Sequence, residues 1–330
     1  MSPTPAHTTT LVTGLSGFIG HELARAWPGG TQHALWGMAW RSPVPEGLEA
    51  RTLRGDLTDP EWVDRAVARL RPNRVFHLAG QSRESLSWHD PWRTYHINLR
   101  SQLNLLQALA RHAPGCRVLL ASTSAVYGFM QGESIAEDHP VQPVSPYGVS
   151  KAAAEMMARQ MSLAADLDLL VVRSFNVIGP GQSADFALSS FAHQIAAIEA
   201  GQRPSVVETG TLAARRDFLD VRDMASALCR VMDQGTSGEV YNIGSGVVVQ
   251  LQDALERLVA FGRTAIEVRT AAQRLRPNDP PIMRANIAKL RSLGGWRPAV
   301  PLDATLQDML NCWRAALASD PAPVEHKEQQ

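Results

Sequence analysis

The sequence predicts an α/β protein with a doubly wound parallel sheet and a smaller C-terminal α/β domain. Three observations support this fold class. Short apolar, β-rich runs alternate with helical patterns from residue 8 to residue 175, a glycine-rich turn follows the first run, and the alternation stops after Phe175. Because a strand, a crossover helix and a second strand form a parallel pair, this alternation predicts one sheet with helices on both faces.

The strands of the expected sheet are apolar runs, and a segment of helical pattern separates each run from the next. These runs are 8–13, 33–40, 74–78, 117–121 and 167–173. One helix ends near Trp27, and others begin at Pro91 and Pro146. Residues 91–112 are expected to form a single long helix, because their apolar residues recur at helical spacing.

The second half of the chain has shorter predicted strands and more loop-like segments, which indicates a second structural unit. We expect a dinucleotide-binding domain at 8–175, completed by parts of 216–246, and a mainly substrate-binding domain at 176–317. Residues 1–7 and 318–330 are polar and are expected to be disordered tails.

Composition restricts the kind of ligand. The chain has 330 residues, of which 45% are hydrophobic and 19% charged, and its 32 basic residues balance 32 acidic ones, so neither nucleic acid nor an anionic membrane is an expected partner. The first ten residues do not resemble a signal peptide, and the apolar runs are too short to cross a bilayer. The three cysteines lack the spacing of metal ligands. We therefore expect a cytoplasmic protein without a metal, acting on a small ligand.

A glycine turn lies between the first strand and the first helix. Glycines at this place let backbone N–H groups and the helix N-terminus approach a pyrophosphate, as in Rossmann folds. A tight strand-to-helix turn without a ligand is the alternative. The turn predicts dinucleotide contacts from Gly14, Ser16, Gly17, Phe18, Ile19 and Gly20.

The second strand is followed by Arg41 instead of an acidic residue. An aspartate there would bind a ribose 2′-hydroxyl, whereas an arginine can neutralise a 2′-phosphate, so NADP(H) is favoured over NAD(H). Asp56 and Leu57 follow another short extended run and are expected near the adenine. A capping role for Asp56 before the helix at Pro60 is the alternative, and it is nearly as good an interpretation.

Two further strand ends carry residues suited to a ligand. One strand ends at Leu78 and runs into the small residues Ala79 and Gly80, where the backbone can pass close to a cofactor. The next strand leads to Thr123. In open parallel sheets the ligand lies at this carboxyl edge, so the Thr123 hydroxyl is placed to meet Tyr147. The alternative for Thr123 is a local capping role in a Ser/Thr-rich loop.

Tyr147 and Lys151 stand four residues apart in a helix that begins at Pro146, so they lie on one helix face. A tyrosine titrates near pH 10 in isolation, and a neighbouring ammonium would make its proton available at neutral pH. The pair is therefore a candidate acid/base device. A solvent-facing Tyr/Lys pair on an ordinary helix is the alternative.

Taken together, these motifs resemble the extended short-chain dehydrogenase/reductase family, in its nucleotide-sugar-modifying branch. Four signatures agree in order: the turn at Gly14, Thr123 before Tyr127-Gly128, the Tyr147/Lys151 pair, and the segment from Arg173 to Pro180. Within that branch, several segments are most similar to reductases of GDP-4-dehydro-6-deoxy-D-mannose, namely 77–82, 179–182, 216–221, 275–279 and 295–298.

The resemblance implies a role for each catalytic position. Thr123 would hydrogen-bond the 4-oxygen of the sugar, and Tyr147 would donate its proton. Lys151 would hold the nicotinamide ribose and favour the tyrosinate. The resemblance also implies subunit pairing through the helices near Pro91 and Pro146, so a homodimer is expected.

Substrate-binding roles are also implied by the resemblance. Ser82 would contact the substrate, and Asn176, Arg216 and Arg276 would bind its diphosphate. Planar guanidinium groups suit two phosphates better than lysines do, which supports this assignment. For each arginine taken alone, an ordinary surface position is the alternative.

The implied reaction is NAD(P)H-dependent reduction of the 4-keto group of a nucleotide-linked 4-keto-6-deoxyhexose, with GDP-4-dehydro-6-deoxy-D-mannose as the expected substrate. The product would be GDP-D-rhamnose or GDP-6-deoxy-D-talose. The alternatives are a nucleotide-sugar 4-epimerase with tightly bound NAD, a GDP-mannose 4,6-dehydratase, and a non-catalytic NADP(H)-binding protein. Related dehydratases carry a glutamate two residues after the threonine, where this chain has Ala125, and a methyl group cannot remove a proton.

Overall fold

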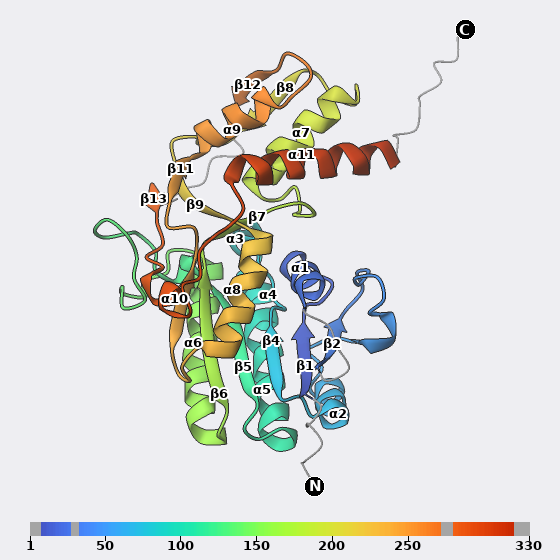
Figure 1. Ribbon diagram of the computed structural model, residues 1–330, viewed down its shortest axis with the longest axis vertical. Coiled ribbons are helices and arrows are strands. Elements are labelled where there is room, and N and C mark those ends of the chain that lie inside the picture. The colour runs from blue at the N-terminus through green and yellow to red at the C-terminus, as the bar shows by residue number, and fades with distance from the viewer. Residues whose placement is uncertain (1–7, 28–32, 272–279, 320–330) are drawn as a thin grey trace.

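The computed structural model describes residues 8–27, 33–271 and 280–319. Its centre is a seven-stranded sheet in which every neighbouring pair is parallel (Figure 1). In spatial order the strands are β10 (Val240–Ile243), β6 (Asp168–Ser174), β5 (Arg117–Thr123), β4 (Arg74–His77), β1 (Thr8–Thr13), β2 (His33–Ala39) and β3 (Thr52–Arg54). The predicted doubly wound parallel sheet is confirmed, and the strand order reverses between β1 and β4.

Helices cover both faces of this sheet (Figure 1). One face carries α1 (Phe18–Ala26) and α8 (Val221–Gln234), and the other carries α2 (Pro60–Leu70), α5 (Ser101–His112) and α6 (Pro146–Ala165). Successive strand residues alternate between the two cores, as Leu11 and Val12 do. Strands buried on both faces need a continuous apolar run, which is why the sequence showed them plainly.

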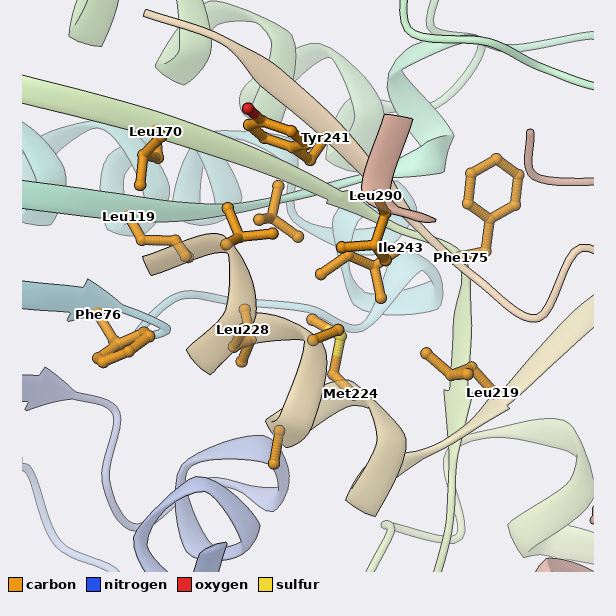
Figure 2. Close-up of a cluster of buried hydrophobic side chains, with 14 of the residues drawn as sticks. Phe76, Leu119, Leu170, Phe175, Leu219, Met224, Leu228, Tyr241, Ile243 and Leu290 are labelled. Carbon is orange, nitrogen blue, oxygen red and sulfur yellow. The ribbon is translucent and has the colours of Figure 1, made fainter. Parts of the chain in front are cut away.

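The core on the α8 side joins strands that are distant in the sequence. Figure 2 shows Met224 and Leu228 of α8 beside Phe76 of β4, Leu119 of β5 and Leu170 of β6, and all five side chains are fully buried. The last strand, β10, therefore completes the sheet from a part of the chain that comes well after the first α/β series.

The second unit is built around β9 (Arg215–Asp220). This strand pairs with β7 (Asn176–Ile178) and β13 (Ile282–Met283) in parallel and with β11 (Val248–Gln250) antiparallel. A two-stranded parallel sheet, β8 (Val206–Thr209) with β12 (Glu267–Thr270), belongs to the same unit. The helices α7 (Ala187–Glu199), α9 (Leu251–Ala260) and α11 (Leu302–Ser319) enclose a separate apolar core at the top of Figure 1.

The segment expected to be one long helix, residues 91–112, is interrupted. It consists of α4 (Pro91–Tyr95), a π-helical turn η2 (His96–Arg100) and α5. Asn98 lies in that turn, and its side chain accepts from Gln81 N at 2.8 Å and donates to Gln81 O at 3.1 Å. The π turn widens the helix at Asn98, so that this side chain can face the sheet edge and keep both hydrogen bonds with the backbone of Gln81.

Shorter elements complete the chain: η1 (Glu49–Arg51), α3 (Glu84–His89), η3 (Ser124–Val126) and α10 (Ala288–Ser292). The helix α11 reaches Ser319, two residues into the segment that was expected to be a tail, and the remaining tail residues lie outside the described residues. Within the described part of the chain, no helix combines the length and the apolar character needed to cross a bilayer.

Candidate functional site

The glycine turn is compressed between α1 and the segment that follows β4. Gly14 has a φ of +73°, and a Cβ atom there would lie 2.8 Å from Ala79 N. A Cβ atom on Gly20 would lie 2.3 Å from Gly14 O. Gly17 begins α1 without a side-chain cap, so the first N–H groups of the helix are directed out of the turn. Ser16 precedes the helix and Phe18 and Ile19 open it, so the predicted contact residues all lie at the N-terminal end of α1.

Arg41 follows β2 beside this turn. Its guanidinium lies over the Trp40 ring at 4.1 Å from the centroid, and the side chain is exposed. Arg54 Nη1 donates to Ser42 O at 3.0 Å, which brings a second guanidinium to the same loop. The sequence analysis did not select Arg54. Its place at the end of β3, beside β2, is the feature that could have indicated it.

Asp56 does not cap the helix at Pro60: Asp59 does, by accepting from Glu61 N at 3.0 Å and Trp62 N at 3.1 Å, whereas Asp56 closes the turn before it. Its Oδ1 accepts from Thr58 N and from Thr58 Oγ1, both at 2.8 Å. The residue is exposed at the carboxyl end of β3, and Leu57 is half-buried and accepts through its carbonyl from Asn104 Nδ2 at 2.9 Å. Both residues are therefore at the expected edge of the sheet, with one carboxyl oxygen of Asp56 committed to the turn.

The segment after β4 joins the end of β1 to the start of α6. Leu78 N and Ala79 N donate to the backbone and side-chain oxygens of Thr13 at 3.2 and 3.3 Å. A Cβ atom on Gly80 would lie 2.9 Å from Asn98 Oδ1 and 3.5 Å from Lys151 Nζ. Glycine is therefore required here because the π turn and α6 approach the backbone this closely.

The structure brings Thr123, Tyr147 and Lys151 together at the carboxyl end of β5. Ser145 caps α6 by accepting from Gly148 N at 3.1 Å, which fixes the first helical turn. The Tyr147 hydroxyl and the Thr123 side chain are hydrogen-bonded. Lys151 Nζ donates to Ala121 O at 2.8 Å, one helical turn below the phenol.

Two residues that the sequence analysis missed hold this arrangement in place. Ser87 Oγ accepts from Tyr147 N at 3.1 Å and donates to Glu84 O at 2.7 Å, which ties α3 to the start of α6. Asn98 Nδ2 also donates to Ser150 Oγ at 2.9 Å. Asn98 could have been noticed as a polar residue within an otherwise apolar helical pattern, whereas Ser87 carries no sequence signal.

The pKa values of the pair differ from the sequence-based expectation. Burial raises the pKa of Tyr147 to about 12, against the hydrogen bond with Thr123, and the charge of Glu84 raises it further. Burial lowers the pKa of Lys151 to about 8, and the charge of Glu155 opposes this. Lys151 is not among the causes that act on the pKa of Tyr147, so desolvation, and not the expected neighbouring ammonium, sets its direction. Tyr147 therefore keeps its proton at neutral pH, as a proton donor must.

The predicted substrate residues lie mainly in the second unit, above this edge. Asn176 begins β7 and its Nδ2 donates to Asp217 O at 3.3 Å, next to the mostly buried Arg216 on β9. Ser82 is exposed after Gln81. Arg276 lies outside the described residues. The structure therefore places Asn176 and Arg216 on neighbouring strands, and Ser82 in the segment that follows β4.

Asp217 is a further residue that sequence analysis missed. Its carboxylate is fully buried and accepts from Ser245 N at 2.6 Å, Ser245 Oγ at 2.7 Å, Gly246 N at 2.8 Å and Ala285 N at 3.1 Å. Burial raises its pKa, and these hydrogen bonds oppose the rise. Asp217 thereby holds the segments that follow β10 and β13 beside Arg216.

Ala125 lies in η3 two residues after Thr123, and its backbone N donates to Thr123 Oγ1 at 3.2 Å. Its methyl group occupies the position where related dehydratases have a glutamate. Position 125 therefore offers no side chain that could act as a base.

Comparison with known proteins supports this geometry. Residues 11–309 match the family described as GDP-mannose 4,6 dehydratase. The chain is 35% identical over 311 residues to GDP-6-deoxy-D-mannose reductase of Pseudomonas aeruginosa, covering 94% of this chain and 98% of that protein.

Two solved structures have the same fold along almost the entire chain. The structure of RMD from Pseudomonas aeruginosa complexed with NADPH has a TM-score of 0.82 at 34% identity, covering 94% of this chain and 99% of that one. The UDP-glucose 4-epimerase of Thermus thermophilus in complex with NAD has a TM-score of 0.81 at 29% identity, covering 94% and 100%. With the parallel sheet, the glycine turn and the Thr123/Tyr147/Lys151 cluster, these matches show that the chain belongs to the GDP-mannose 4,6-dehydratase family of extended short-chain dehydrogenases/reductases.

Proposed function

We propose that this protein reduces the 4-keto group of GDP-4-dehydro-6-deoxy-D-mannose, using NADPH. The observation that carries the proposal is the convergence of Thr123, Tyr147 and Lys151 beside the glycine turn. The similarity to GDP-6-deoxy-D-mannose reductase supports the choice of substrate. The product is GDP-D-rhamnose or its C4 epimer, GDP-6-deoxy-D-talose.

Bound NADPH would supply the hydride for C4 of the sugar. The chain supplies the proton: the Tyr147 hydroxyl donates to the oxygen at C4, and Thr123 orients that oxygen through its own hydroxyl. Lys151 interacts with the ribose and stabilises the tyrosinate that the transfer leaves. The raised pKa of Tyr147 agrees with this direction, because a reductase needs a protonated tyrosine at the start.

The residues present fit a phosphorylated dinucleotide. The turn from Gly14 to Gly20 forms a cradle that a Cβ atom would fill, and an uncapped helix N-terminus faces it. Arg41 and Arg54 flank Ser42 at the end of β2, where two guanidiniums suit a 2′-phosphate. Asp56, Leu57, Leu78, Ala79 and Gly80 would contact the adenine and ribose portions.

The substrate would lie between the two units. Asn176, Arg216 and Arg276 would bind the diphosphate, and Ser82 would contact the sugar side. This interaction provides binding energy away from the reacting carbon, which orients the keto group against the cofactor. The division into a dinucleotide-binding domain at 8–175 and a mainly substrate-binding domain at 176–317 belongs to the same proposal.

A homodimer is also part of the proposal. The family resemblance implies pairing through the helices near Pro91 and Pro146, and exposed apolar side chains gather on α4 and α6 and on the neighbouring α3: Trp88 (52% exposed), Trp92 (80%), Val149 (42%), Met156 (75%) and Leu163 (85%). On α6 three of these recur every seven residues, so they form one stripe. Light scattering during gel filtration should give twice the chain mass, and Trp92→Glu with Met156→Glu should give the monomer.

The deciding experiment mixes the purified protein with GDP-4-dehydro-6-deoxy-D-mannose and NADPH. We expect loss of the reduced-cofactor absorbance in proportion to product, and NMR of the product identifies the configuration at C4. A protein that retains NAD through purification and interconverts UDP-sugars without an added reductant would be an epimerase instead. Absence of turnover with all such substrates would overturn the enzymatic proposal.

A further inference from the structure

Below the catalytic pair, α6 carries a buried carboxylate that the proposed reaction does not use. Tyr147, Lys151 and Glu155 are spaced four residues apart, so they follow one side of the helix. The Glu155 side chain is 12% exposed, and Arg173, which it contacts, is 7% exposed. A buried ion pair thus lies one helical turn beneath the catalytic lysine.

This carboxylate is held in a fixed orientation. Arg173 Nε lies 3.1 and 3.2 Å from the two oxygens of Glu155, and Arg173 Nη2 lies 2.7 Å from Oε2. Ser122 Oγ also donates to Oε1. Ser122 and Arg173 are paired positions on β5 and β6, so the sheet register presents both donors together.

Arg173 is itself restrained on its other side. Its Nη1 donates to Glu137 O at 3.1 Å, and its guanidinium lies 4.8 Å from the centroid of the Tyr127 ring. Taking two charges out of water costs free energy that their attraction often only balances, so such a pair is weak support for a purely stabilising role. Its place beneath Lys151 suggests that the pair serves the site.

The surroundings of Lys151 identify which group favours its charged form. Burial lowers the pKa of Lys151, and the negative charge of Glu155 raises it, with a resulting value of about 8. His77 faces Lys151 from β4, and burial lowers the pKa of His77 to about 3, so that ring is neutral. On α6 the titratable groups next to Lys151 are Tyr147 and Glu155. From the surrounding elements, the titratable and charged groups are His77 on β4, Glu84 on α3 and Arg173 on β6.

We propose that Glu155 is a positioning residue whose carboxylate, clamped by Arg173 and Ser122, keeps the Lys151 ammonium charged and directed at the catalytic edge. The inference rests on the proposed function only in that Lys151 serves the reduction. Tyr147, Lys151 and Glu155 then follow one another along one side of α6. The fixed negative charge of Glu155 lies at the end of this row, next to the positive charge of Lys151.

The charge of Lys151 can be measured without turnover, because the chain contains only three lysines, at positions 151, 289 and 327. Reductive methylation with ¹³C-formaldehyde gives separate NMR signals, which Lys289→Arg and Lys327→Arg assign. In the wild-type protein the Lys151 signal should titrate near pH 8. In Glu155→Gln its midpoint should fall by about one unit or more, since an opposite charge is lost.

A matched control is Glu239→Gln. Glu239 pairs with Lys289 next to the start of β10, so this variant removes a lysine-paired carboxylate away from the site. It should leave the Lys151 midpoint unchanged. An unchanged midpoint in folded Glu155→Gln would overturn the proposal, whether or not the protein proves to be a reductase.

Glu155→Gln leaves Arg173 buried without its counter-ion, so a second variant, Glu155→Gln with Arg173→Met, removes both charges. Because burial and Glu155 are the causes that act on the pKa of Lys151, the double variant should show the same lowered midpoint. A wild-type midpoint in the folded double variant would overturn the proposal. In active enzyme, the alkaline limb of kcat/KM should move to lower pH in Glu155→Gln, and Glu155→Asp should restore part of the shift.

Discussion

The large sheet and the small sheet around β9 hold their ligand-facing residues by different means. In the large sheet, parallel strands whose central members are buried on both faces bring the glycine turn, Gly80 and Thr123 to one edge through backbone register. The strands around β9 have two to six residues, and one buried side chain, Asp217, holds the neighbouring segments to them. The predicted cofactor edge therefore depends on backbone packing, whereas the proposed diphosphate-binding side depends on a few polar contacts.

The largest expected effect concerns Tyr147, which α6 places beside Thr123 at the edge of the large sheet. Tyr147→Phe removes the proton donor, so kcat should fall by about 10²–10⁴-fold, the usual contribution of a positioned acid. NADPH binding, followed by fluorescence, should be retained. Tyr95→Phe, whose ring contacts Trp92 on α4, is the control and should keep near wild-type kcat. Full turnover in Tyr147→Phe would remove the central claim.

The small sheet can be tested by removing its main polar connection. Asp217→Ala leaves three buried N–H groups without an acceptor, which should lower the free energy of unfolding by about 3 kcal/mol. Denaturant unfolding measures this loss. In protein that remains folded, the KM for the sugar nucleotide should rise far more than the KM for NADPH.

The control for this loss is Asp253→Ala, which removes an exposed carboxylate from the first turn of α9. It should change stability by no more than about 0.5 kcal/mol. Equal increases of both KM values in Asp217→Ala would contradict the separation between the two regions.

A smaller effect is expected at the outer end of the cofactor edge. Arg41→Ser removes a guanidinium from the predicted 2′-phosphate position, and a charged hydrogen bond of about 1.5–3 kcal/mol corresponds to a KM for NADPH raised about 10–100-fold. The KM for NADH should stay the same. Arg51→Ser in η1 removes an exposed arginine from the same lobe and serves as the control. An equal rise in the KM for NADH would show that Arg41 does not recognise the 2′-phosphate.

The mildest test varies pH alone. Lys151 carries its charge below its pKa of about 8, so kcat/KM for NADPH should be level near neutral pH and decline above that value. Above that pH, kcat/KM should fall by at most about tenfold for each further pH unit. Tyr147, with a pKa raised to about 12, stays protonated over this range. A profile that remained flat to about pH 9.5 would show that the reaction does not need the ammonium.

The sequence by itself determined the features that depend on local spacing. The glycine turn, the alternation of strands and helices, and the four-residue spacing of Tyr147 and Lys151 all follow from periodicity and from the chemistry of single residues. Arg41 and Thr123 were predicted because each follows a strand, and the carboxyl ends of parallel strands lie at the ligand-binding edge of the sheet whichever strands are neighbours.

Only the tertiary structure decided the contacts between distant segments. The π turn at Asn98 depends on Gln81 and Ser150, the ion pair of Glu155 depends on the register of β5 and β6, and Asp217 bonds segments 28 and 68 residues away. It also decided the pKa values, because burial, and not the lysine four residues along the helix, determines the direction of the Tyr147 shift. Local patterns report the conformation of a segment, whereas partners and desolvation are fixed only when the sheet brings the segments together.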